Sequence, residues 1–152
     1  MERLDSRVRV AWSLGALAGG AVVGALAVFA DRFVVPVPTW AVAAVAVAVA
    51  ALGLVHAALR YRRWRYAVQA DALYLERGVL TEVETAVPFV RIQHVDTRRG
   101  PLARLLGLAT VVVYTAGSRG ADVAVPGLSP ARARELRDEI RSLAGGDGED
   151  AV

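Results

Sequence analysis

Cysteine and lysine are absent from this 152-residue chain, and only two histidines are present. The lack of cysteine excludes disulfides, thiolate nucleophiles and zinc-thiolate sites, so packing must hold the fold together. The lack of lysine excludes lysine-dependent chemistry, since all 18 basic residues are arginines. The chain is 55% hydrophobic, which is a high share for a soluble protein of this size.

Charge is also missing from two long stretches near the start of the chain. Residues 11–30 carry no charged side chain, and residues 33–59 carry none apart from a possible charge on His56. A helix needs about 20 apolar residues to cross roughly 30 Å of hydrocarbon. We therefore expect a hairpin of two membrane-spanning helices, from about Val10 to Ala30 and from about Trp40 to Leu59.

The residues that flank the two spans predict their orientation. The connecting turn contains Pro36 and Pro38, which disfavour helix, and only Arg32, next to Asp31, lies near it. The opposite ends of the spans carry Arg3, Arg7, Arg9, Arg60, Arg62, Arg63 and Arg65. The positive-inside rule then places both termini in the cytoplasm, as in a multi-pass protein of the cell (inner) membrane.

A cleaved signal peptide is the alternative interpretation of the first span, because residues 28–30 resemble a small-x-small cleavage site. The apolar run is longer than the roughly 7–15 residues of a signal h-region, and a second span follows at once. These two features favour the hairpin.

Two features inside the spans invite a functional interpretation. Gly15, Gly19, Gly20 and Gly24 include two pairs spaced four apart, a pattern that lets another helix approach closely, within the hairpin or between subunits. Spans rich in alanine and glycine also produce such spacing by chance. His56 lies near the cytoplasmic boundary, where interfacial anchoring is favoured over proton or metal handling.

The chain after the spans has the composition of a soluble domain. Residues 60–144 carry fourteen arginines against nine acidic residues, a balance of +5. A positive surface beside a membrane attracts anionic headgroups by about 1 kcal/mol per arginine, but the bias is too weak to imply nucleic acid. Arg60, Arg62, Arg63 and Arg65 are most simply the topological stop of the second span, with lipid recognition as the alternative.

Short β-branched segments separated by turns predict an antiparallel sheet in this region. The expected strands are 65–69, 73–77, 79–87, 92–97, 110–115 and 122–125. Ser129 as N-cap and Pro130 at the first position begin a closing helix, whose apolar stripe is Leu136, Ile140 and Leu143. The predicted organisation is a tail over 1–9, a hairpin over 10–59, a domain over 60–144 and a disordered acidic tail over 145–152.

Six motifs of the chain resemble the bacterial PH-like domain family (bPH2), in particular its small YdbS-type members with two spans before the domain. They are WRY (64–66), LYLERGVL (73–80), VPFVRIQHV (87–95), GPLARLLGLA (100–109), YTAG (114–117) and PGL (126–128). The resemblance implies an α+β protein in which a PH-like antiparallel β-sandwich or partly open barrel is capped by a C-terminal helix. It implies no activity, catalytic residue or cofactor, and it suggests as partner a larger membrane protein with repeated domains of this type, or self-association.

Candidate chemistry is sparse. His94 and Asp96 share one face of a predicted strand, but two ligands do not make a metal site and no nucleophile is placed beside them. The segment 98–107 is more distinctive, because Leu102, Leu105 and Leu106 share a helical face flanked by arginines. Arg98, Arg99 and Arg104 are therefore candidate lipid contacts. The alternative is a connection whose leucines fill one end of the sheet.

Two functions follow from these features. The first is a noncatalytic inner-membrane protein whose cytoplasmic PH-like domain mediates protein assembly at the membrane surface. The second is an anionic-lipid-binding component of envelope maintenance or transport.

Overall fold

The chain folds as two units in a computed structural model, which describes residues 1–117 and 122–146. One unit is residues 9–62, and the other combines residues 1–8 with the chain from Arg63 onward. The second unit therefore combines the residues that precede the first unit in the sequence with those that follow it.

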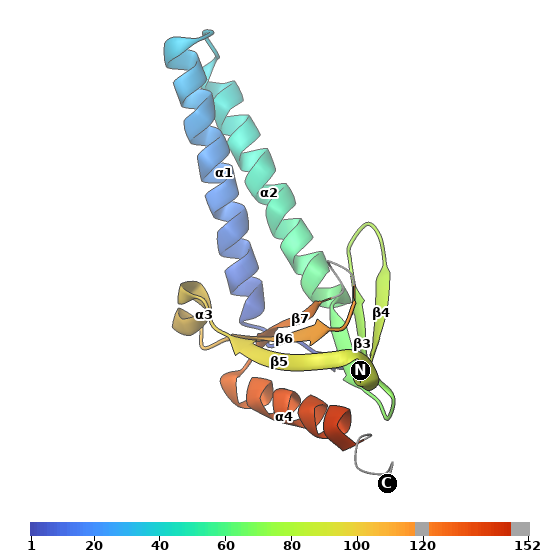
Figure 1. Ribbon diagram of the computed structural model, residues 1–152. Coiled ribbons are helices and arrows are strands. Elements are labelled where there is room, and N and C mark those ends of the chain that lie inside the picture. The colour runs from blue at the N-terminus through green and yellow to red at the C-terminus, as the bar shows by residue number, and fades with distance from the viewer. Residues whose placement is uncertain (118–121, 147–152) are drawn as a thin grey trace. The chain divides into compact units, whose positions relative to one another are not determined.

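Residues 9–62 form a helical hairpin from α1 (Val8–Phe33) and α2 (Thr39–Arg63). Both helices are long and apolar enough to cross a membrane, and only 6% of the most apolar window of each is buried, unlike a core helix. The Asp31 carboxylate accepts a hydrogen bond from the backbone N–H of Val37 at 2.8 Å, which fastens the proline-containing turn. The two spans lie side by side in Figure 1 and run one to four residues beyond their expected ends.

Two antiparallel sheets form the framework of the other unit. The first has the strand order β1-β2-β3-β4, and the second has the order β5-β6-β7. The strands are β1 (Glu2–Arg3), β2 (Arg65–Val68), β3 (Ala72–Arg77), β4 (Val83–Pro88), β5 (Ile92–Arg98), β6 (Ala109–Thr115) and β7 (Val123–Leu128). The sheets remain separate and do not close into a barrel.

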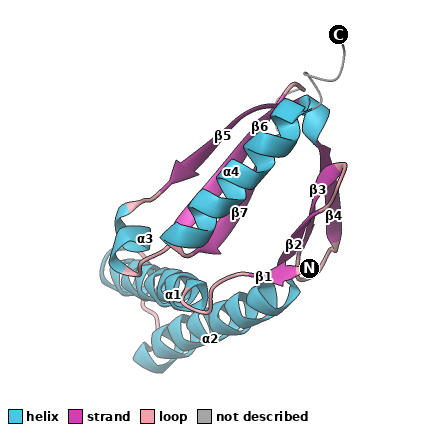
Figure 2. Cartoon of the chain, turned by 90° about the horizontal axis from the view of Figure 1, so that it is seen from below, coloured by secondary structure: helices cyan, strands magenta, loops and turns pink. Residues whose placement is uncertain are grey.

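The core of this unit lies between the sheets and the closing helix α4 (Pro130–Gly146). Ala133, Leu136 and Ile140, spaced three and four apart, are completely buried, and α4 lies across the second sheet in Figure 2. Val111 and Val113 of β6 are equally buried. Burial of each such aliphatic side chain stabilises the fold by about 1.5–3 kcal/mol.

The predicted α+β class, with a PH-like domain capped by a C-terminal helix, is confirmed, but three boundaries differ. Residues 1–8, expected as a separate tail, cluster with the domain, and Glu2–Arg3 forms β1. Strand β4 begins at Val83, because residues 78–82 form a tight turn. Helix α4 extends to Gly146, the last described residue, two residues past the expected end at Ala144. The rest of the expected tail, 147–152, lies outside the described residues.

Candidate functional site

The first notable cluster fastens the N-terminal strand to the rest of the domain. The Glu2 carboxylate accepts a hydrogen bond from the Tyr66 hydroxyl at 2.8 Å, and two from the Arg132 guanidinium at 2.6 and 3.0 Å. Tyr66 lies on β2 and is 1% exposed, while Arg132 belongs to α4. One carboxylate thus links an edge strand of the first sheet to the helix that covers the second.

Electrostatics make this cluster a fixed link. Burial raises the pKa of Glu2, but the hydrogen bonds from Arg132 and Tyr66 outweigh it and hold the pKa below the ordinary 4.5. Burial and the neighbouring carboxylate raise the pKa of Tyr66 to about 12. Near neutral pH Glu2 is therefore an anion and Tyr66 a neutral donor, so neither group is poised to exchange a proton.

The segment between β1 and α1 packs against the end of β7. The backbone N–H of Asp5 donates to the Gly127 carbonyl at 2.8 Å. Gly127 has a φ of +63°, and a Cβ added there would lie 2.6 Å from the Cβ of Val8. Only glycine fits this backbone conformation and this close approach. The residues that lead into α1 are thus an integral part of the domain.

A short helix, α3 (Pro101–Leu105), forms a corner between β5 and β6. The Arg7 guanidinium donates to the Leu106 carbonyl and the Arg99 guanidinium to the Leu108 carbonyl, both at 3.2 Å. Gly107, at a φ of +63°, turns the chain out of the helix. Arg7 thus satisfies a carbonyl at the end of the helix, and Arg99 satisfies one in the segment that leads into β6.

The leucines of α3 face solvent. Leu105 is 85% exposed and Leu102 is 42% exposed, so these side chains do not fill the end of a sheet. Leu106 is half-buried. The corner is an ordered backbone that presents apolar side chains outward.

The three arginines predicted as lipid contacts at this corner have different surroundings. The Arg98 guanidinium donates to the Tyr114 hydroxyl and lies 5.6 Å from the centre of its ring. Arg99 is held by the Leu108 carbonyl. The exposed Arg104 has no ion-pair partner among the described residues, which leaves its charge available to a ligand.

The arginine cluster after the second span is also mixed. The Arg60 guanidinium lies 4.2 Å from the ring centre of Trp12, a cation–π contact worth about 0.5–1 kcal/mol at an exposed site. Arg62 and Arg63 are exposed, and Arg65 stands opposite Glu76 in the register of β2 and β3. Within the described residues none of the four forms an ion pair.

The four glycines of α1 separate into two pairs. A Cβ at Gly20 would lie 2.9 Å from the Ala50 Cβ, and one at Gly24 would lie 3.3 Å from the Ala46 Cβ. These two glycines therefore face α2. A Cβ at Gly15 or Gly19 would meet nothing within 4 Å, so these two do not contribute to packing within the hairpin.

The two histidines show no metal chemistry. His94 stacks on Tyr114 with ring centres 4.1 Å apart and planes inclined by 16°. Asp96 lies on the same exposed face of β5, but the described residues contain no cluster of three or more potential metal ligands. His56 is exposed on α2. The structure thus adds no third ligand to the predicted His94 and Asp96 pair.

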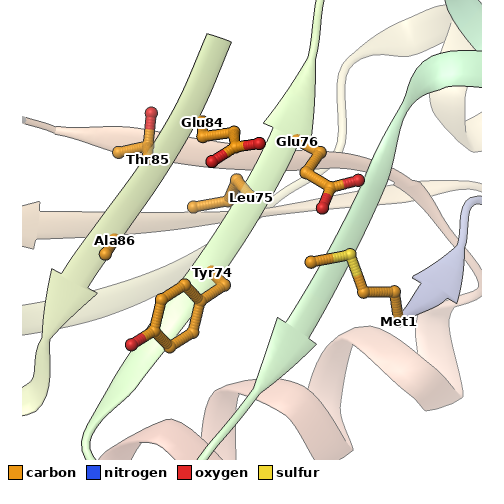
Figure 3. A pocket seen from close by; sticks show the side chains of 7 residues that line it. All are labelled: Met1, Tyr74, Leu75, Glu76, Glu84, Thr85 and Ala86. Atoms are coloured by element: carbon orange, nitrogen blue, oxygen red, sulfur yellow. The ribbon is translucent and has the colours of Figure 1, made fainter.

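Among the described residues, two cavities of similar size open on the surface of the domain. The cavity drawn in Figure 3 has a volume of about 260 Å³ and lies over β3 and β4, where Glu76 stands opposite Glu84. The other, also about 260 Å³, lies between β5 and the end of α4, with His94 and Arg141 in its lining. The first cavity is lined by the hydroxyl-bearing Tyr74 and Thr85 and by the carboxylates of Glu76 and Glu84. The lining of the second contains no serine, threonine or cysteine that His94 could activate.

Three features of these surfaces were not predicted from the sequence. The Glu2 cluster depends on residues distant in the chain and leaves no local pattern. Gly53 of α2, whose added Cβ would lie 2.7 Å from the Ala16 Cβ, has no glycine four residues away to draw attention. Leu80, 97% exposed in the turn between β3 and β4, had one available signal, an apolar residue two positions after a turn glycine.

Comparisons with known proteins agree with this architecture. A family model described as "Bacterial PH domain" matches residues 16–144. The transmembrane protein YdbS of Bacillus subtilis is 38% identical over 86 residues, which cover 57% of this chain and 52% of that protein. The alignment therefore spans about half the length of the curated relative. No solved structure gives a significant match.

Proposed function

The chain belongs to the bacterial PH domain family, and we propose that it is a noncatalytic protein of the inner membrane whose PH-like domain assembles with another protein at the cytoplasmic surface. The observation that carries the proposal is that residues 1–8 fold together with the chain from Arg63 onward. Both ends of the helical hairpin therefore enter one domain.

No linker separates the domain from the spans. Helix α2 ends at Arg63 and β2 begins at Arg65, while Val8 is both the first residue of α1 and the residue seated on Gly127. A domain joined in this way stays at the membrane surface, where neighbouring membrane proteins meet it at high effective concentration. The arginines at this end of the spans favour the cytoplasmic side.

The proposed partner is a larger membrane protein with repeated domains of the same type, with self-association as the alternative. Strands β1 and β4 are the edges of one sheet, and β5 and β7 are the edges of the other. Open sheet edges can pair with a strand of another protein.

Purification from gently solubilised membranes tests this assembly. A tagged full chain should co-purify with a larger membrane protein of the same domain family in a fixed ratio. The matched control replaces residues 64–146 with an unrelated soluble domain, which keeps both spans and should lose the partner. A full chain that purifies alone, or a control that retains the partner, contradicts the proposal.

Binding of anionic lipid, in envelope maintenance or transport, is the second candidate function. It is supported by the exposed Leu105 beside the uncompensated Arg104 on a corner that Arg7 and Arg99 hold in place. Apolar side chains flanked by arginine are typical of contacts with anionic headgroups.

The lipids that co-purify with the full chain provide the test. Changing Arg98, Arg99 and Arg104 together to Gln should reduce the phosphatidylglycerol retained. The control changes the same number of exposed arginines that form no ion pair with another described residue, namely Arg91, Arg134 and Arg141. Equal lipid retention by both triple variants removes this candidate.

A further inference from the structure

We propose that two exposed apolar tips of the domain, the turn between β3 and β4 and the helix α3, insert into the headgroup region of an anionic bilayer. This goes beyond the assembly function and rests on the second candidate function, anionic-lipid binding, which it deepens by naming the side chains that enter the bilayer. It also involves Leu80, which lies outside every surface considered from the sequence.

The β3–β4 turn presents the first tip on a rigid backbone. Gly78 has a φ of +112°, and a Cβ there would lie 1.8 Å from the Thr81 carbonyl oxygen. The turn is thus tight and depends on glycine. Leu80, two residues later, is 97% exposed, and Val83 beyond it is 39% exposed. A single exposed leucine is ordinary on a protein surface, but here Leu80 and Val83 together present apolar surface on one turn.

Helix α3 presents the second tip. Leu102 and Leu105 are three residues apart, so they share one helical face, and both are exposed. The Arg7 and Arg99 guanidinium groups hold the carbonyls that follow this helix. The two leucines are therefore held outward before any ligand binds, which reduces the entropy lost when they insert.

Chain connectivity relates the turn to the end of β2 that follows the second span. Arg65 of β2 pairs with Glu76 of β3, and the two strands are antiparallel. The end of β2 that is next to α2 therefore lies beside the end of β3 that leads to Leu80. Beyond that pair β3 continues for one residue, to Arg77, about 3.3 Å further, where the turn of residues 78–82 begins. The turn extends towards the end of β2 at which the chain arrives from the second span.

The other tip lies beside the connection to the first span. Arg7, whose guanidinium contacts Leu106, is only three residues before Val10, where the expected first span begins. Within the domain, α3 and the β3–β4 turn both lie on the side away from α4 (Figure 1). Each tip is thus close to one of the two points at which the domain joins the spans.

The charges around the tips differ, and this makes the proposal more specific. Arg99 and Arg104 accompany α3 with no acidic residue between them, whereas the turn combines Arg77 with Glu82. Anionic headgroups attract the arginine-rich tip more strongly. Insertion of α3 should therefore depend more on anionic lipid than insertion of the turn.

Single cysteines with an environment-sensitive fluorophore test the insertion, because the chain has no cysteine of its own. The variants are Leu80→Cys and Leu105→Cys, with Ser142→Cys on the exposed side of α4 as the matched control. The labelled full chain is reconstituted in phosphatidylcholine vesicles with and without phosphatidylglycerol. Emission from the labels at 80 and 105 should shift to the blue and be quenched by doxyl-labelled lipid. The label at 142 should keep the emission wavelength of a water-exposed fluorophore and should not be quenched.

Removal of phosphatidylglycerol should reduce quenching more at 105 than at 80. A label at either tip that behaves like the label at 142 overturns the two-tip insertion, and equal loss at both tips overturns the role of the arginines. Unlabelled protein gives an independent readout, since backbone amides of α3 and the turn should exchange more slowly in anionic vesicles than in neutral micelles. Unchanged exchange at both tips also overturns the proposal.

Discussion

Replacing Gly127 with alanine should strongly destabilise the domain, because two separate penalties act at this position. A φ of +63° places an L-residue in the left-handed region, at a cost of about 1–2 kcal/mol. The new Cβ would also lie 2.6 Å from the Cβ and Cγ2 of Val8, and such overpacking costs about 1–3 kcal/mol. The expected total is about 2–5 kcal/mol, a large part of a typical domain stability of about 5–15 kcal/mol.

Thermal unfolding of the full chain in micelles, followed by circular dichroism, measures this effect. For a domain of about 60–100 residues each kcal/mol shifts the melting temperature by about 4–8 °C, so Gly127→Ala should lower it by about 8 °C or more. Gly100→Ala is the matched control, since Gly100 has a φ of −72° and open space around its Cβ position. The control should be neutral, or stabilising by about 0.4–1 kcal/mol.

The reasoning is refuted if Gly127→Ala melts at the same temperature as Gly100→Ala. Such a result would mean that Val8 does not pack against Gly127 at the end of β7. The first span would then not be joined to the domain by this contact.

Three further changes test other parts of the structure. Glu2→Gln should lower the free energy of unfolding by about 0.5–1 kcal/mol at pH 7. Hydrogen bonds from Arg132 and Tyr66 place the folded pKa of Glu2 below 4.5, so this stabilisation is fully present above pH 4.5 and disappears as the pH falls through the folded pKa. The unfolding curves of variant and parent should therefore converge in acid. Gly53→Val should loosen the hairpin, since the added Cβ would lie 2.7 Å from the Ala16 Cβ, whereas Gly19→Val meets nothing; equal melting of these two variants in micelles would contradict the packing. Ile140→Ala should lower the free energy of unfolding by about 2–5 kcal/mol, because this side chain is fully buried; a loss below about 1 kcal/mol in denaturant titration would contradict a core position.

The spans were predictable because their signal is local and compositional. Twenty uncharged residues specify a membrane helix without reference to any other part of the chain. The same holds for α4, whose N-cap and first proline mark its start; the Ser129 hydroxyl accepts a hydrogen bond from the backbone N–H of Arg132 at 3.2 Å. Its C-terminal end was predicted less well, because glycine permits a helix to stop but does not force it.

The attachment of the N-terminal segment was not predictable in the same way. Strand β1 has two residues, Glu2 and Arg3, too few for any alternation. Its position depends on Tyr66, 64 residues away, and on Arg132, 130 residues away. Such contacts arise only once the sheets and α4 are assembled, so no local pattern in the sequence reports them.

The candidate surfaces were partly predictable. The composition of residues 98–107 left two interpretations open, an exposed amphipathic corner and a connection whose leucines fill one end of the sheet; Leu102 and Leu105 of α3 are exposed. The spacing of glycines in the first span did not distinguish Gly20 and Gly24, which face α2, from Gly15 and Gly19. That distinction depends on the rotation of one helix against the other, which the facing alanines determine.

Native mass spectrometry of the full chain, released directly from its own membranes, tests the proposed assembly function most directly. The account predicts a complex of defined mass that contains a larger membrane protein with PH-like domains. A chain that emerges as a monomer carrying only lipid would contradict assembly, and it would leave anionic-lipid binding as the function.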